Sequence, residues 1–76
     1  MKVLTYGDCT NTYQYDITKR EMIIVVTDES VTPLVEKTRR SGSNNIAELW
    51  AIEEALLYAR SCGVVELDLY SDSRLP

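Results

Sequence analysis

The hydrophobic period of this 76-residue sequence changes at the segment SGSNN, residues 41–45, and that change limits the possible folds. From residue 46 to about residue 61 the apolar residues recur at helical spacing, so we predict one helix there. The face expected to be buried consists of Leu49, Ile52, Ala55, Leu56 and Ala59. Gly63 follows at the position where a left-handed residue commonly ends a helix.

The segments on both sides of this helix have the alternation and β-branched content of strands. We predict strands over residues 2–7 (KVLTYG), 21–27 (EMIIVVT), 31–40 (VTPLVEKTRR) and 64–72 (VVELDLYSD), and a polar loop over residues 9–20. Pro33 favours an edge position for the third strand. A hydrophobic content of 45% with 26% charged residues is typical of a folded chain. The order β-β-β-α-β therefore predicts one small α/β domain over residues 1–76.

Short connections require successive elements to run in opposite directions, which predicts where the acidic residues gather. The first strand ends near Asp8, the helix starts just before Glu48, and the last strand finishes at Asp72. All three positions are expected at one end of the domain. Asp28, in the turn between the second and third strands, is expected at the opposite end.

Three carboxylates at one end repel one another unless a cation lies among them. The sequence contains no histidine, and oxygen ligands alone suit Mg²⁺ or Mn²⁺. Two such ions can promote attack of water on a phosphodiester. A purely structural interpretation stays open for Glu48, because Asn45 and Glu48 have the spacing of a helix capping box.

The net charge of −4 counts against a protein that binds nucleic acid through bulk electrostatics. Positive charge is concentrated locally in EKTRRSGSNN, where Lys37, Arg39 and Arg40 form either a solvated strand end or a phosphate contact. The longest apolar run, residues 22–26, is far too short for a membrane span. Cys9 and Cys62 are expected at opposite ends of the domain as reduced thiols, which favours a cytoplasmic location.

The segment NNIAELWAIEEALLYARSCGVVELDLYSDSRL, residues 44–75, resembles the central block of the ribonuclease H family. It contains the asparagine pair, the glutamate within AEL, a long helix rich in alanine and leucine, and a strand that ends in SDS. The GD pair, residues 7–8, is similar to the first catalytic aspartate of that family. The resemblance implies that Asp8, Glu48 and Asp72 are catalytic ligands of Mg²⁺ or Mn²⁺. It also implies that Asn44, Asn45 and Arg74 contact an RNA–DNA hybrid, and Arg40 is a further candidate for nucleic-acid binding.

The resemblance implies a ribonuclease H-like mixed sheet that stops before the second half of the fold. The implied activity is hydrolysis of the RNA strand of RNA–DNA hybrids, weak or absent in so short a chain. Two departures favour an alternative, a non-catalytic nucleic-acid-binding or assembly module. The loop after Asp8 lacks the glycines of the family, and the fourth acidic residue is missing unless Asp16 replaces it. The last strand would also expose an unpaired edge, so we expect a fragment of a longer protein or a homodimer formed through that edge.

Overall fold

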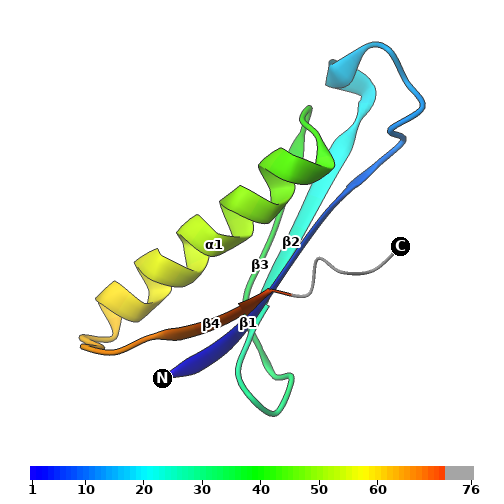
Figure 1. Ribbon diagram of the computed structural model, residues 1–76. Helices are drawn as coiled ribbons and strands as arrows, with labels where there is room; N and C mark the ends of the chain where they lie inside the picture. The colour runs from blue at the N-terminus through cyan, green and yellow to red at the C-terminus, as the bar shows by residue number, and fades with distance from the viewer. Residues whose placement is uncertain (72–76) are drawn as a thin grey trace.

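A computed structural model describes residues 1–71 of the chain and shows one helix lying across a four-stranded sheet (Figure 1). The elements are β1 (Lys2–Thr10), β2 (Glu21–Thr27), β3 (Pro33–Arg40), α1 (Asn44–Ser61) and β4 (Asp68–Ser71), with a 3-10 turn at Ile17–Lys19. The strand order is β3-β2-β1-β4, in which β4 runs parallel to β1 and the other pairs are antiparallel. The predicted β-β-β-α-β order and mixed α/β sheet are confirmed. Within these 71 residues no helix is long and apolar enough to cross a membrane.

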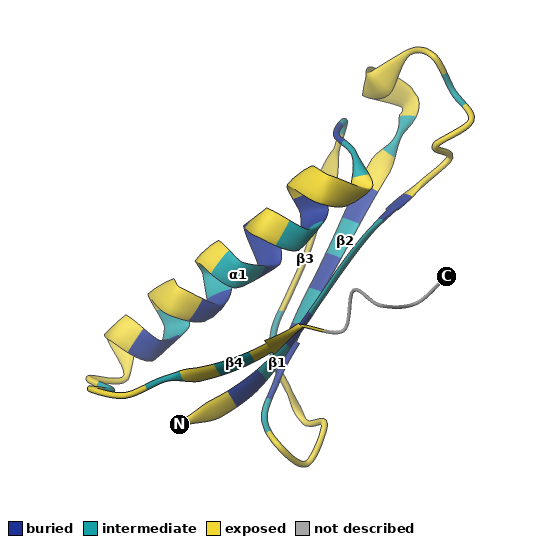
Figure 2. Cartoon of the chain, in the orientation of Figure 1, coloured by how far each residue is buried: buried dark blue, intermediate teal, exposed yellow. Residues whose placement is uncertain are grey.

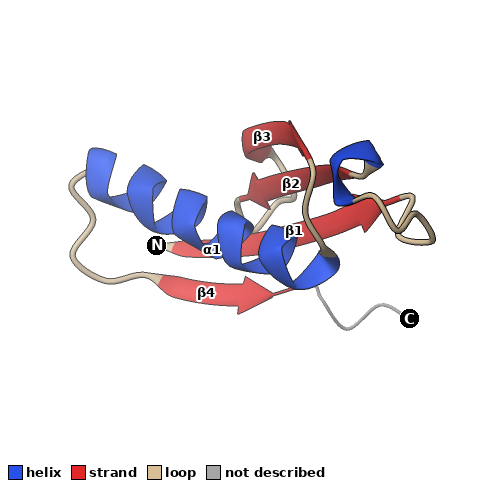
Figure 3. Cartoon of the chain, turned by 90° about the horizontal axis from the view of Figure 1, so that it is seen from above, coloured by secondary structure: helices blue, strands red, loops and turns tan. Residues whose placement is uncertain are grey.

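Helix α1 covers one face of the sheet, and the core lies between the two (Figure 3). Alternate residues of a strand point to opposite faces, so every second residue of β1 and β2 is buried beneath the helix. The buried side chains on this side are Val3, Thr5 and Cys9 from β1 and Met22, Ile24 and Val26 from β2. The opposite face of the sheet carries no helix within the described part of the chain.

The helix buries only part of the predicted face: Ala55 and Ala59 are buried as expected, whereas the prediction is wrong for the two leucines. Leu49 and Leu56 are 67% and 51% exposed. Figure 2 shows exposed positions along the outer side of α1 and buried ones on the side toward the sheet. The residues that α1 buries are Ala47, Trp50, Ala51, Ala55 and Ala59. Small side chains bring the helix axis close to the sheet, which a row of leucines would prevent. Trp50 is the large side chain among them, and the Arg39 guanidinium lies 4.3 Å from the centre of its ring.

The close approach of α1 depends on Gly7. A Cβ atom at this position would lie 2.8 Å from the backbone nitrogen of Glu48 and closer still to the carbonyl oxygen of Ala47. Real Cβ atoms do not come so near to backbone atoms, so only glycine allows the first turns of α1 to rest on β1.

The two ends of α1 test two features of the sequence. The N-cap is Ser43, whose Oγ accepts a hydrogen bond from the Ile46 N–H at 3.2 Å, so the Asn45–Glu48 capping box that the sequence left open as an alternative does not form. At the other end Gly63 has a φ of 71°, and the Val64 N–H donates to the carbonyl of Ala59. The expected left-handed cap is therefore confirmed.

Strands β2, β3 and β4 form where the sequence predicts strands, but β3 and β4 begin later than predicted. β2 has the predicted bounds, and β3 is an edge strand that begins at Pro33. β4 is shorter than predicted, since Val65 is 97% exposed and outside the strand, while Leu67 and Leu69 pack against the core. Among the described residues β4 pairs only with β1, so it presents the unpaired edge that the sequence predicted.

We expect Gly7→Ala to lower the free energy of unfolding by about 3 kcal/mol, because the added methyl group forces α1 away from β1. Urea denaturation measures the change. Gly63→Ala is the matched control, since no atom lies within 4 Å of its Cβ position and only its positive φ opposes alanine. The control is expected to lose about 1 kcal/mol. Equal losses in the two variants would contradict this account of the packing.

Candidate functional site

The candidate site lies where the first turns of α1 meet the C-terminal part of β1. Asp8 is the seventh residue of β1, and the preceding residue, Gly7, lies against the backbone of Ala47 and Glu48. The structure therefore brings Asp8 and Glu48 to the same region of the domain, as their directions predicted. Asp28 lies in the β2–β3 turn at the opposite end of the sheet, also as predicted.

One backbone N–H connects the aspartate to the helix. The Cys9 N–H is 2.8 Å from Asp8 Oδ1 and also 2.8 Å from Asn44 Oδ1, so both oxygens accept from it. The other carboxylate oxygen, Asp8 Oδ2, accepts from the Tyr6 hydroxyl at 3.2 Å. Asp8 is half-buried and its orientation is fixed through both oxygens.

The side chain of Asp8 starts on the face of the sheet opposite α1. Gly7 faces the helix, and neighbouring residues of a strand point to opposite sides, so the Asp8 Cβ points away from the helix. Tyr6, two residues earlier, is on the same side and donates to the carboxylate. Asp8 and Glu48 thus approach the same end of β1 from its two sides.

Glu48 is half-buried in the second turn of α1, and capping does not explain its presence there. Ser43 already provides the side-chain acceptor for the first turn. The Glu48 carboxylate, one helical turn beyond the N-cap, is therefore available to bind a cation.

Asp72 and Arg74 lie outside the described residues. β4 runs parallel to β1 toward the same end of the sheet, and its last residue, Ser71, pairs with Thr5. Within residues 1–71 no three acidic or cysteine side chains are close enough together to hold a metal ion. The donor set that Asp8 and Glu48 offer consists of carboxylate oxygens, which fits Mg²⁺ or Mn²⁺ and does not fit softer metals.

Asp16, considered as a replacement for the fourth acidic residue, has a local structural role. Its Oδ1 accepts from the Thr18 hydroxyl at 2.6 Å and from the Thr18 N–H at 3.0 Å, which caps the 3-10 turn. The hydrogen bond from the Thr18 hydroxyl and, to a lesser extent, the one from the Thr18 N–H hold the pKa of the exposed Asp16 carboxyl below its usual value.

The predicted nucleic-acid contacts have different surroundings. Asn45 is exposed at the start of α1, whereas Asn44 uses its side-chain oxygen to hold Cys9. In the basic segment, Lys37 pairs with Glu54 at 2.7 Å and Arg39 covers Trp50. Within residues 1–71 Arg40 makes neither kind of contact and is exposed. Of the three basic residues, Arg40 is therefore the best candidate for a phosphate contact.

Sequence reasoning missed Arg20. Its guanidinium donates two hydrogen bonds to the carbonyl of Gln14, at 3.1 and 2.7 Å, and one to the carbonyl of Gly42 at 3.2 Å. It thereby ties the β1–β2 loop to the loop that precedes α1. No local sequence signal marks a lone arginine for such a role, because its partners are backbone atoms distant in sequence.

This strand order, with one helix packed across β1, is the N-terminal part of the ribonuclease H-like fold. The chain is similar to the N-terminal RNase H domain of Rv2228c from Mycobacterium tuberculosis, with 24% identity and a TM-score of 0.58 over 96% of this chain and 53% of that one. It is also similar to RNase H1 from Halobacterium salinarum, with 24% identity and a TM-score of 0.57 over 97% and 56%. A third structure, LC11-RNase H1 in complex with an RNA/DNA hybrid, has 23% identity and a TM-score of 0.54 over 95% and 55%.

The chain spans about half the length of these solved structures. No protein-family model and no curated protein matches the sequence. The similarity therefore establishes the fold.

We expect Asn44→Ala to lower the free energy of unfolding by about 1 kcal/mol, because the Cys9 N–H loses the acceptor on α1. Asn45→Ala is the control, since the Asn45 side chain is exposed and makes no hydrogen bond within residues 1–71. Urea denaturation gives the energies, and amide hydrogen exchange at Cys9 reports the contact directly. Faster exchange at Cys9 in the Asn45 variant than in the Asn44 variant would contradict the assignment.

Proposed function

We propose that this chain carries the first half of a ribonuclease H-type site that hydrolyses the RNA strand of an RNA–DNA hybrid with Mg²⁺ or Mn²⁺. The observation that carries the proposal is that Gly7, the residue before Asp8, packs against the backbone of Glu48 at one end of β1 in a ribonuclease H-like half-fold. The parallel course of β4 toward the same end supports Asp72 as the third ligand. The similarity to an RNase H1 complexed with an RNA/DNA hybrid supports the substrate class.

In this proposal the residues of this chain hold the metal ions and orient the metal ligands. Asp8, Glu48 and Asp72 would hold the metal ions, and the hydrogen bonds from Tyr6 and Cys9 keep the Asp8 carboxylate in one orientation. Bound ions would supply activation of water and neutralise the charge that builds on the phosphate. The sequence contains no histidine, and bound ions would supply this activation of water without one.

The asparagines and arginines would contact the substrate. Asn45 is exposed at the start of α1, where it can reach the minor-groove edge at which a 2′-hydroxyl is recognised. Asn44 would act mainly by placing the helix, since its oxygen is already bonded to Cys9. Arg40 and Arg74 would contact the sugar–phosphate backbone.

Mg²⁺ at ten times its dissociation constant is expected to stabilise the protein by about 1.4 kcal/mol, because it binds only the folded state. For a domain of this size the midpoint of thermal unfolding rises by roughly 6–11 °C. Glu48→Gln or Asp72→Asn is expected to remove the rise. Glu29→Gln, in the β2–β3 turn at the other end, is the control and retains it.

A rise that survives both site variants would contradict the metal site. Cleavage of a labelled hybrid then separates the two function classes. The nuclease proposal predicts weak metal-dependent cleavage by this short chain, which Glu48→Gln abolishes. The alternative, a non-catalytic module, predicts binding of the hybrid by the wild-type chain with no cleavage.

The free edge of β4 supports self-association as a second part of the proposal. Two copies related by a two-fold axis can pair their β4 strands and continue the sheet. We expect light scattering to give a mass that rises with concentration from the monomer value of 8.6 kDa toward twice that value. A constant monomer mass in a folded sample would contradict the dimer.

A further inference from the structure

A polar pocket of about 180 Å³ lies at the end of the sheet where β1, β2 and β3 reach the β1–β2 loop. Its lining residues are Thr10, Asn11, Lys19, Arg20, Glu21 and Arg40. Three of the six are cations in a chain whose net charge is −4. Of these cations the sequence analysis singled out only Arg40, because Lys19 and Arg20 lie in the separate β1–β2 loop.

Strand pairing explains how the pocket forms. Thr10 pairs with Glu21, and Glu21 pairs with Arg40, so the three residues form one row across the sheet. Paired residues point to the same face, and the row lies two residues beyond Asp8 on its side of the sheet. The 3-10 turn capped by Asp16 then places Lys19 beside the row.

The positive charge of the pocket has no close carboxylate partner. Within residues 1–71 the one ion pair joins Lys37 to Glu54. Neither Lys19 nor Arg40 therefore has an acidic oxygen within 4 Å in this part of the chain. Among the described residues the Arg20 guanidinium donates to the carbonyls of Gln14 and Gly42, which orient it without neutralising it. Glu21 also lines the pocket, and its carboxylate opposes an anion there.

We propose that this pocket binds one phosphate group of a nucleic-acid strand and so sets the register of that strand relative to Asp8. The inference rests on the proposed function, which it extends by a binding site. A fixed guanidinium with a lysine and a second arginine is a donor set suited to a phosphate. Two residues of β1 span about 7 Å, so the pocket lies a nucleotide or two from the acidic site.

The first experiment uses inorganic phosphate as the probe. Titration into the full 76-residue chain, followed by NMR, is expected to shift the amide signals of Lys19, Arg20 and Arg40. The signals around Lys2, at the other end of β1, should stay in place. Absence of shifts at the pocket overturns the inference.

The second experiment measures hybrid binding without divalent ions, so that no cleavage occurs, at several salt concentrations. Lys19→Gln and Arg40→Gln are each expected to reduce the slope of log K against log salt by about 1, since each variant removes one phosphate contact. Lys2→Gln is the matched control and leaves the slope unchanged. Glu21→Gln is expected to tighten binding, because it removes a negative charge from the pocket.

The outcomes separate the two proposals. If the wild-type chain binds the hybrid but Lys19→Gln and Arg40→Gln behave as Lys2→Gln does, the pocket is wrong and the nucleic-acid proposal survives. If phosphate shifts the pocket signals while the hybrid does not bind, the pocket accepts a free phosphate and its assignment to nucleic acid is overturned. Weaker binding in Glu21→Gln would overturn the electrostatic account.

Discussion

The contact between Gly7 and the backbone of Ala47 and Glu48 is the constraint on which the rest of this structure depends. Without a side chain at Gly7, the first turns of α1 come close enough for Asn44 to reach the Cys9 N–H. The same short separation explains why the helix buries alanines. It also fixes the position of Glu48 relative to Asp8, because the backbones of the two segments touch one residue away from the aspartate. The packing of α1 on β1 and the placement of Glu48 relative to Asp8 therefore have the same cause.

The loops at this end are held by hydrogen bonds between side chains and backbone. Arg20 connects Gln14 in the β1–β2 loop to Gly42 in the β3–α1 loop, and the Ser41 N–H donates to the Arg20 carbonyl at 2.7 Å. Gly42 has a φ of 131° and lies so close to Met22 that a side chain there would strike the thioether. The polar pocket and the start of α1 therefore share one support. A strand bound at the pocket, as proposed, would be held in a defined position relative to the acidic residues.

Much of this fold could be predicted from sequence, because its signals are local. The run EMIIVVT gave β2 its bounds, Pro33 marked an edge strand, and Gly63 marked the end of α1. The buried face of α1 could not be predicted, since the helix carries a leucine stripe and an alanine stripe and only Gly7, far away in sequence, selects between them. The N-cap was misassigned for a related reason: Ser43 and Asn45 are both good caps, and the contact of Asn44 with Cys9 decides. Directions alone placed Asp8 with Glu48, but Arg20 and the pocket depend on tertiary contacts.

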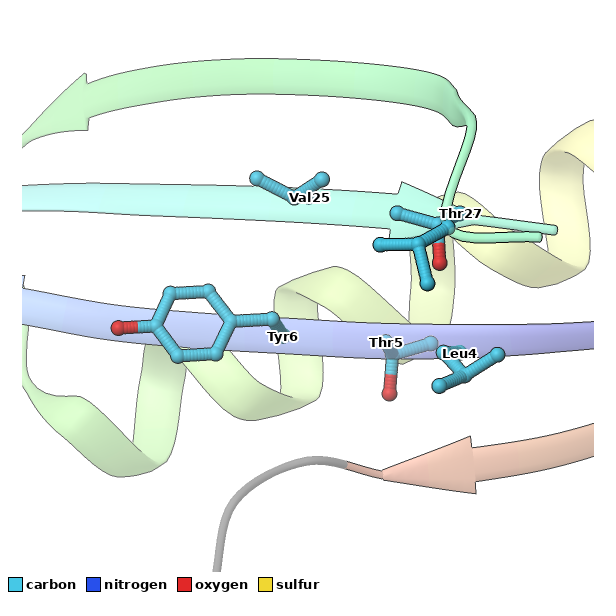
Figure 4. A pocket seen from close by; sticks show the side chains of 6 residues that line it. Leu4, Thr5, Tyr6, Val25 and Thr27 are labelled. Atoms are coloured by element: carbon cyan, nitrogen blue, oxygen red, sulfur yellow. The ribbon is translucent and has the colours of Figure 1, made fainter. Parts of the chain in front are cut away.

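The face of the sheet that carries Asp8 connects the open surface of this half-fold with its chemistry. Next to Tyr6, which donates to Asp8, lies a hollow of about 260 Å³ lined by Leu4, Val25 and Thr27 among others (Figure 4). A hollow lined mainly by apolar side chains is stabilised when it is covered, and a cover would also remove water from around the Asp8 carboxylate. Electrostatic attraction between a carboxylate and a metal ion strengthens as water is excluded. In the proposed nuclease, a polypeptide that covers this face would therefore stabilise the sheet and strengthen metal binding together, which would couple assembly to activity.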